Sequence, residues 1–346
     1  MIVPPKRCAA ARARADLPEA VGPATISSGL ARGAEHALGD WVMKFVLVLV
    51  AARDKVTLTD TMVARVRELA AGGPPVWLSP GEAAEIPCMN PPDFALVRAA
   101  IDNAPVDVMC VRDRGRRKAV LVADMDSTIV TSETLDELAA EAGVGERVAA
   151  ITARSMAGEL DFADALRERV ALLEGLDVAA LERTWRRTAI MPGARELVAT
   201  MRAHGAVTAL VSGGFTWFTS RVAAEVGFDT HRANELLDDG TRLIGRVAEP
   251  VLDRDAKRTA LHELAATRGV KLSATLAVGD GANDLAMIAD AGLGVAYHAK
   301  PILAEAAPVR IEHGDLRALL FAQGYPAASF REGGRDAGAR SAGSGS

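Results

Sequence analysis

Two carboxylates two residues apart, Asp124 and Asp126, are the residues whose types and spacing most clearly indicate chemistry. They stand in the sequence DMDST, directly after the apolar run 119–123. A short continuous apolar run bounded by charged residues predicts a strand buried on both faces of a parallel sheet. Ligands of open α/β sheets bind at the carboxyl ends of such strands. Capping of a following helix by Asp126, Ser127 or Thr128 is the alternative explanation.

Two more polar clusters follow apolar runs in the same way. The sequence SGG, residues 212–214, follows the run 207–211, and GDGAND, residues 279–284, follows the run 275–278. Because the carboxyl ends of parallel strands share one edge of a sheet, we expect the three clusters to meet there.

The acidic members of these clusters predict a metal site. Asp124, Asp280, Asn283 and Asp284 would together offer oxygen ligands of the kind that Mg²⁺ prefers. A glycine turn with an Asn or Asp helix cap explains GDGAND equally well when that motif is taken alone.

The SGG cluster and one lysine are candidates for holding phosphate. The hydroxyl of Ser212 and the amides of Gly213 and Gly214 are predicted at a helix N-terminus, which suits phosphate oxygens. Lys257 is predicted near the start of a helix at 255–267, where a single lysine is ordinarily a solvated charge. A phosphate-binding role for Lys257 is therefore predicted only in combination with the other motifs.

Composition narrows the class of protein. The chain has 346 residues, 49% of them hydrophobic, and a net charge of -5, which disfavours nucleic acid and anionic membranes as partners. Its most apolar segment, 45–52, is far shorter than the roughly 20 residues that span a bilayer. Three separated cysteines (Cys8, Cys88 and Cys110) favour a reducing, cytoplasmic location.

The first third of the chain predicts a leader and a small α+β module. Residues 1–42 lack periodicity and are expected to be disordered, and Met43 is an alternative start. The module at 43–112 is compatible with an ACT-like fold and a homodimer, and packing or oligomerisation is a simpler role for it than ligand sensing. Its predicted elements are a strand at 44–51, a helix at 57–69, a strand near 75–78, a helix at 91–103 and a strand at 105–111.

The rest predicts an α/β domain at 113–325 with an inserted cap. Apolar residues recur at helical spacing after the DMDST motif, so a helical cap is expected at about 131–190, where it would exclude water and recognise substrate. A disordered tail is expected at 326–346. The α/β alternation resumes with a helix ending at 204, strand 207–211, helix 215–226, helix 255–267, strand 275–278, helix 284–291 and strand 293–296.

With DMDST, SGG, Lys257 and GDGAND in this order, the sequence resembles the haloacid dehalogenase superfamily of phosphotransferases. The runs SETLDELAAEAGV, RERVALLEGL, VSGGFT and VGDGANDLAMIADAGLGVAYHAKP resemble the phosphoserine phosphatase family over about residues 118–321. The resemblance implies a Rossmann-like doubly wound parallel sheet, with a helical cap inserted after the first core strand. It also implies hydrolysis of O-phospho-L-serine, the last step of serine biosynthesis.

The resemblance further implies roles for individual residues. Asp124 would be the nucleophile that forms an aspartyl-phosphate, and Asp126 the general acid and base. Mg²⁺ would be bound by Asp124, the backbone carbonyl of Asp126 and Asp280, with Asn283 and Asp284 in support. The substrate would be bound by Glu133, Met156, Phe162, Arg169, Ser212, Gly213, Lys257 and Asn283, with Glu133 taking the ammonium group and Arg169 the carboxylate.

Two alternatives stay open from the sequence. The same machinery would serve another small phosphomonoester, or would pass the phosphoryl group to an alcohol other than water. A protein of another class, a catalytically silent one whose N-terminal module senses an amino acid, is also compatible with the sequence.

Overall fold

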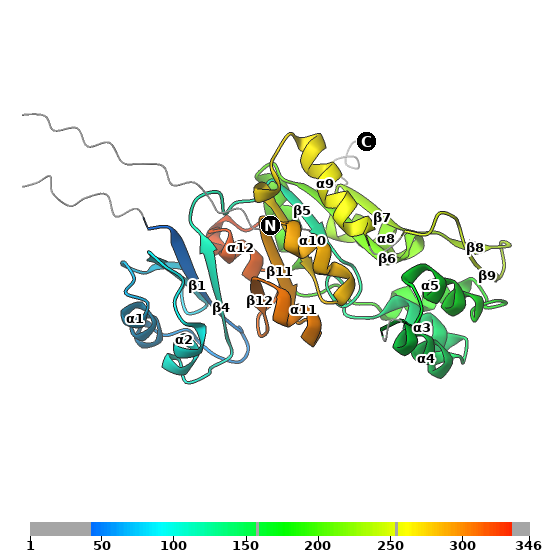
Figure 1. The fold of residues 1–346 in the computed structure, drawn as a ribbon, viewed down its shortest axis with the longest axis horizontal. Helices are drawn as coiled ribbons and strands as arrows, with labels where there is room; N and C mark the ends of the chain where they lie inside the picture. Colours follow the sequence, from blue (N-terminus) through cyan, green and yellow to red (C-terminus); the bar gives the residue numbers. More distant parts are fainter. Residues whose placement is uncertain (1–42, 157–158, 253–254, 334–346) are drawn as a thin grey trace, which may run out of the picture. The chain divides into compact units, whose positions relative to one another are not determined.

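The computed structural model describes residues 43–156, 159–252 and 255–333, without the side chain of Met156 (Figure 1). The predicted leader at 1–42 and the end of the predicted tail, 334–346, lie outside the described residues. Within the described part, no helix is both long enough and apolar enough to cross a bilayer.

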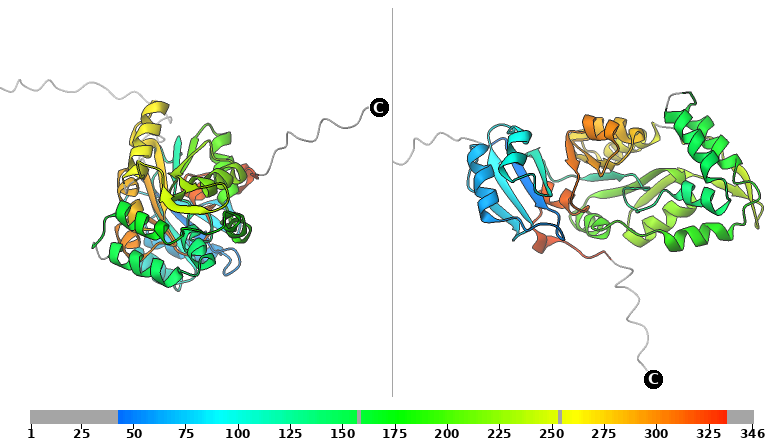
Figure 2. Two further views of the ribbon diagram at one scale, coloured as in Figure 1. Left: turned by 90° about the vertical axis from the view of Figure 1, so that its right-hand side faces the viewer. Right: turned by 90° about the horizontal axis from the view of Figure 1, so that it is seen from below.

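An antiparallel sheet of four strands and two helices forms the N-terminal module, which confirms the predicted α+β class. The strand order is β2-β3-β1-β4, and both helices lie on one face of the sheet (Figure 2, right). This β-α-β-β-α-β order is that of the ferredoxin-like motif, and the likeness to an ACT domain stays a prediction. The elements are β1 (Phe45–Ala51), α1 (Asp60–Leu69), β2 (Val76–Ser79), β3 (Ala83–Cys88), α2 (Phe94–Ala100) and β4 (Val106–Arg112).

Strand β1 is apolar throughout because both of its faces are covered. Leu47 and Leu49 pack among the residues of α1 and α2. Val46, Val48 and Val50 point the other way and belong to the large cluster that fills the core of the second sheet. Alternating side chains of a strand lie on opposite faces, so a strand between two apolar layers loses the alternation of polar and apolar residues.

Strand β3 was not predicted from the sequence, although it lies between β2 and β1. Its sequence contains Pro87, which is depleted in the inner strands of sheets. The pairing of β2 with β3 starts at Glu85, so Pro87 lies beyond that ladder and its missing N–H removes no bond from it.

Six parallel strands form the second sheet in the order β12-β11-β10-β5-β6-β7. The central strand β5 pairs with β6 on one side and with β10 on the other. The chain adds β6 and β7 on one side of β5 and then β10, β11 and β12 on the other side. This is the predicted doubly wound architecture. The strands are β5 (Val120–Ala123), β6 (Val207–Phe215), β7 (Thr230–Asn234), β10 (Thr275–Gly279), β11 (Leu293–Tyr297) and β12 (Val309–Ile311).

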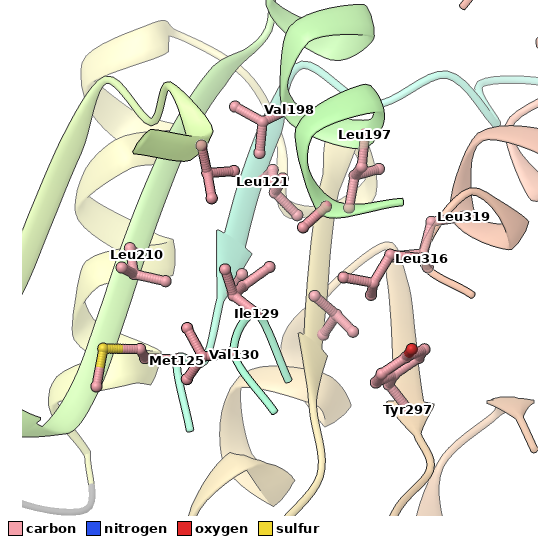
Figure 3. Close-up of a cluster of buried hydrophobic side chains, with 14 of the residues drawn as sticks. Leu121, Met125, Ile129, Val130, Leu197, Val198, Leu210, Tyr297, Leu316 and Leu319 are labelled. Carbon is pink, nitrogen blue, oxygen red and sulfur yellow. The ribbon is translucent and has the colours of Figure 1, made fainter. Parts of the chain in front are cut away.

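Helices cover both faces of this sheet. In β5, Leu121 and Ala123 face the layer of α7 (Ala194–Ala203), α8 (Thr216–Val226) and α12 (Ala318–Ala322). Figure 3 shows Leu121 beside Leu197 and Val198 of α7. Val120 and Val122 face the opposite layer, formed by α9 (Ala256–Arg268), α10 (Leu285–Asp290) and α11 (Pro301–Ala306).

Between β5 and α7, where the sequence predicted a cap, the described residues form four helices: α3 (Thr134–Glu141), α4 (Gly145–Met156), α5 (Phe162–Ala171) and α6 (Ala179–Arg187). A hairpin that the sequence did not predict, β8 (Leu236–Asp238) and β9 (Leu243–Val247), packs beside α5 (Figure 1). Leu243 donates to the carbonyl of Leu176 and accepts from the N–H of Gly175.

The chain remains structured beyond the predicted start of the tail at residue 326. Residues Ala327–Ser329 form a 3-10 turn, and the ring of Phe330 lies 5.0 Å from that of Phe321. The tail prediction was therefore wrong for the residues up to 333, because Phe330 supplies apolar surface that a composition argument overlooked. Helices α11 and α12 and strands β7 and β12 were also not predicted.

A buried carboxylate joins the N-terminal module to the core. Asp107 of β4 is 3% exposed, and it accepts hydrogen bonds from the N–H groups of Glu312, His313 and Gly314 at 2.7, 3.0 and 2.7 Å. These residues directly follow β12. One side chain thereby satisfies three backbone donors that would otherwise lack partners.

We expect Asp107→Ala to lower the free energy of unfolding by about 3 kcal/mol, because buried donors lose a charged acceptor. Urea unfolding followed by circular dichroism measures this change. Asp54→Ala, which removes an exposed carboxylate from the same module, should leave the unfolding midpoint nearly unchanged. Equal destabilisation by the two variants would contradict this role for Asp107.

Candidate functional site

The three predicted polar clusters meet at the carboxyl edge of the parallel sheet. They follow or end the adjacent strands β5, β6 and β10, and a cavity of about 120 Å³ lies there. Nine of the predicted site residues line it, namely Asp124, Asp126, Glu133, Phe162, Arg169, Ser212, Gly213, Asp280 and Asn283. Lys257 lines an adjoining smaller space with Ser212, and the side chain of Met156 lies outside the described part.

Lys257 lies at the base of the site between two buried carboxylates. Its Nζ is 2.7 Å from Oδ2 of Asp124 and 2.6 Å from Oδ1 of Asp284. Burial alone would lower the pKa of Lys257, but the two carboxylates raise it above its usual value. The lysine is therefore an ammonium ion that fixes the side chain of Asp124.

Asp126 is half-buried beside the other acids. Its Oδ1 accepts from the N–H of Thr134 at 2.9 Å, and its Oδ2 lies 3.4 Å from Oγ of Ser212. Burial, together with the charges of Asp124 and Glu133, raises the pKa of Asp126 to about 7. A carboxyl group with such a pKa can both give and take a proton near neutral pH.

Three buried acids form a candidate metal site. One carboxylate oxygen from each of Asp124, Asp280 and Asp284 lies within 4.8 Å of the others. Burial and the charge of Asp124 raise the pKa of Asp280. Lys257 contacts both Asp124 and Asp284, and Lys300 contacts Asp280, so each of the three acids has a lysine of the chain beside it. Buried carboxylate oxygens are the donors that hard divalent cations take.

The SGG cluster is arranged differently from the prediction. Helix α8 begins at Thr216, and SGG belongs to the end of β6 rather than to a helix N-terminus. The N–H of Gly214 donates to Oγ of Ser212 at 2.9 Å. The prediction failed here because the strand continues past its apolar run.

Gly213 permits a close approach between the cap helices and the strand. A Cβ atom at this position would lie 2.9 Å from Cζ of Phe162, which begins α5. Any larger residue at this position would therefore clash with the phenyl ring unless the ring moved.

Two charged cap residues face the cavity. Glu133 is at the N-cap of α3 but its side chain makes no capping bond, so simple capping does not explain it. Instead it accepts from Oγ of Ser127 at 3.0 Å. Burial lowers the pKa of Arg169, although Asp136 and Glu133 oppose this effect. Nε of Arg169 donates to the carbonyl of Ala165.

Lys300 lines the cavity, although it was not predicted as a site residue from the sequence. Its Nζ lies 3.2 Å from Oδ2 of Asp280 and 3.3 Å from Oε1 of Glu133. It follows β11 by three residues, so it belongs to the same carboxyl edge of the sheet as the other clusters. Its position after a fourth parallel strand is the signal that could have identified it.

The known proteins that this chain resembles are hydrolases and phosphatases, which agrees with the chemistry of the site. A family model of haloacid dehalogenase-like hydrolases matches residues 121–289. The phosphoserine phosphatase of Streptococcus thermophilus is 47% identical over 199 residues, which cover 58% of this chain and 93% of that protein. The phosphoserine phosphatase of Archaeoglobus fulgidus is 44% identical over 217 residues, and the match covers 63% of each chain.

The similarity to solved structures extends into the N-terminal module. The crystal structure of a probable phosphoserine phosphatase from Vibrio cholerae has a TM-score of 0.67 and 30% identity, and the match covers 83% of this chain and 88% of that one.

The raised pKa of Asp126 predicts a pH-dependent effect on stability. The folded state holds the proton more tightly than the unfolded state, so this group reduces stability as the pH rises from about 4 to 7. We expect Asp126→Asn to raise the free energy of unfolding of the metal-free protein by about 2 kcal/mol at pH 8. The gain should shrink toward pH 4, where the wild-type carboxyl is protonated in the folded state and about half protonated in the unfolded state.

Urea unfolding in a chelating buffer at the two pH values measures this difference. Asp290→Asn is the matched control, because His262 and Arg258 lower the pKa of Asp290 and its substitution should change stability in the opposite direction. A gain from Asp126→Asn that is independent of pH would contradict the assignment.

Proposed function

The chain belongs to the haloacid dehalogenase-like hydrolases, and on this premise we propose that it hydrolyses O-phospho-L-serine to L-serine and phosphate. The observation that carries the proposal is the pairing of Asp124, fixed by Lys257, with Asp126, whose pKa is about 7. The first is suited to nucleophilic attack, and the second to proton transfer. The names of the relatives support the substrate.

In the first half of the reaction, the carboxylate of Asp124 attacks phosphorus while Ser212, Gly213 and Lys257 hold the phosphoryl oxygens. An O–P bond to Asp124 forms, the bond from phosphorus to the seryl oxygen breaks, and Asp126 gives its proton to that oxygen. In the second half, Asp126 takes a proton from water, which attacks the aspartyl-phosphate. Phosphate leaves, and Asp124 is restored.

The acidic site fits Mg²⁺, which we include in the proposal. Asp124, Asp280 and the backbone carbonyl of Asp126 would bind it, with Asn283 and Asp284 close by. When bound, the cation neutralises part of the phosphate charge. The two lysines at the site, Lys257 and Lys300, both already contact carboxylates.

The cap residues account for recognition of an amino acid. In our proposal Glu133 binds the ammonium group of the substrate, and Arg169 binds its carboxylate. Phe162 lines the pocket with an apolar ring. Both charges of the zwitterion would then be paired inside the cavity, as buried charges require.

The proposed enzyme contains an ACT-like module at 43–112, a phosphatase domain at 113–325 and a cap at about 131–190, and it works in the cytoplasm. Its partner is the small-molecule substrate rather than nucleic acid or a membrane, and homodimer formation is assigned to the module. Release of phosphate from O-phosphoserine and a short panel of phosphomonoesters separates this function from a broader phosphatase and from a catalytically silent binding protein.

We expect Asp124→Asn to reduce phosphate release from O-phosphoserine to the background level, because an amide cannot accept the phosphoryl group. Asp164→Asn, an isosteric change at an exposed position of α5, is the control and should keep full activity. Circular dichroism checks that both variants fold. Turnover by Asp124→Asn comparable to the wild type would refute the mechanism.

We expect Arg169→Ala to raise the activation free energy that corresponds to kcat/KM for O-phosphoserine by about 2–5 kcal/mol, because the substrate carboxylate loses its buried partner. The loss for p-nitrophenyl phosphate, which lacks that carboxylate, should be much smaller. Arg167→Ala is the matched control on the same helix, since Arg167 is exposed and pairs with Glu249. Equal losses on both substrates would remove Arg169 from substrate recognition while leaving the phosphatase chemistry intact.

A further inference from the structure

A second cavity lies at the opposite edge of the parallel sheet. Its volume is about 410 Å³, which falls within the usual range for small-molecule sites. It is lined by residues that precede or begin the core strands, such as Lys118 before β5, Ser273 before β10 and Leu293 in β11. The candidate catalytic residues follow the other ends of these strands. Phe45 and Val111 of the N-terminal module also line the cavity.

The charges around this cavity are all positive. Arg112, Arg114, Arg116 and Lys118 line it, and no acidic residue does. Glu85 neutralises Arg116 through two hydrogen bonds of 2.7 and 3.1 Å. Within the described ranges, no salt bridge joins the other three cations to a carboxylate. The chain carries a net charge of -5, so this is a locally positive hollow on an acidic protein.

Lys118 is the most constrained of these cations. It is 9% exposed, and its Nζ donates to the carbonyls of Gly115 and Ser273 at 2.9 and 2.8 Å. Burial lowers the pKa of Lys118, and no neighbouring carboxylate opposes this effect. A buried ammonium ion without a counter-ion is costly, and an anion in the cavity would offset that cost.

The remaining wall is apolar. Val111, Leu293 and Val309 are each less than 9% exposed and line the cavity. Phe45 also lines it, and its side chain packs against the cluster that contains Leu47 and Leu49. The guanidinium of Arg112 lies 5.7 Å from the centre of the Phe45 ring, which places a cation directly beside an aromatic surface. A fully hydrated inorganic anion would leave this apolar surface unused.

We infer that this cavity binds a small organic anion that carries an apolar or aromatic group. The anionic group pairs with Lys118 and Arg114, and the apolar group packs against Val111 and Leu293. Such a ligand contacts both the N-terminal module and the parallel-sheet core. The inference does not depend on the proposed phosphatase activity, because none of the catalytic residues lines this cavity.

The experiment titrates the full-length protein with 8-anilino-1-naphthalenesulfonate, a fluorescent aromatic anion, in the presence of saturating inorganic phosphate. N-phenyl-1-naphthylamine, which has the same rings without the sulfonate, is the neutral comparison. We expect one equivalent of the sulfonate to bind with enhanced fluorescence, and the neutral probe to bind at least about tenfold more weakly, as the loss of a charge-assisted contact predicts. Phosphate should not displace the sulfonate, since it competes only at the opposite edge of the sheet.

Two variants locate the bound probe. Lys118→Met keeps the length of the side chain and should weaken binding of the sulfonate about tenfold, and Arg114→Gln should weaken it about threefold. Arg147→Gln removes an equal charge from an exposed position of α4 and should change nothing. If Lys118→Met does not fold, the affinity of Arg114→Gln for the sulfonate tests the inference, because Arg114 is exposed. Unchanged affinity in the cavity variants, displacement by phosphate, or equal binding of the neutral probe would overturn the inference.

Discussion

The contact of Lys257 with Asp124 and Asp284 is the interaction on which the catalytic edge of the sheet depends. The three charges come from α9, from the loop after β5 and from the turn after β10, and all three are buried. Separately, each would carry a large desolvation cost, and removal of one leaves an uncompensated charge in the interior. The position of the proposed nucleophile and the packing of these elements are therefore set by the same contact.

The position of the cap is linked to that of the proposed acid. The first amide of α3, that of Thr134, binds the carboxylate of Asp126, while Phe162 of α5 packs against the space left by Gly213. Between the two acids and α3, Ser127 has a φ of 53°, a left-handed conformation that is uncommon for residues other than glycine. Its hydroxyl donates to Glu133. This turn therefore places Glu133, the proposed partner of the substrate's ammonium group, beside Asp126.

The parts of the structure that were predictable are those encoded over a few residues. The apolar runs of β5, β6 and β10 and the polar residues after them were enough to locate the edge of the sheet with Asp124, Asp126, Ser212, Gly213, Asp280 and Asn283. The cap residues Glu133, Phe162 and Arg169 were expected only from the resemblance to a known family. Elements held by distant partners were not predictable. The hairpin β8–β9 pairs through Leu243 with Leu176, and Pro87 obscured β3. Lys300 acquires its role only when the strand order brings it to Asp280, and no local pattern contains that information.

The contact of Asp107 with the loop after β12 joins residues that are 205 or more positions apart. A ribosome adds roughly 5–20 residues per second, so the carboxylate is made about 10–40 s before the amides that it binds. During this interval one face of the β1–β4 sheet, including Val46, Val48 and Val50, has no layer to cover it. The nascent chain thus exposes an apolar β-surface until β12 has been synthesised. Expression of this protein is consequently most vulnerable to aggregation during translation, before the final tenth of the chain has been synthesised.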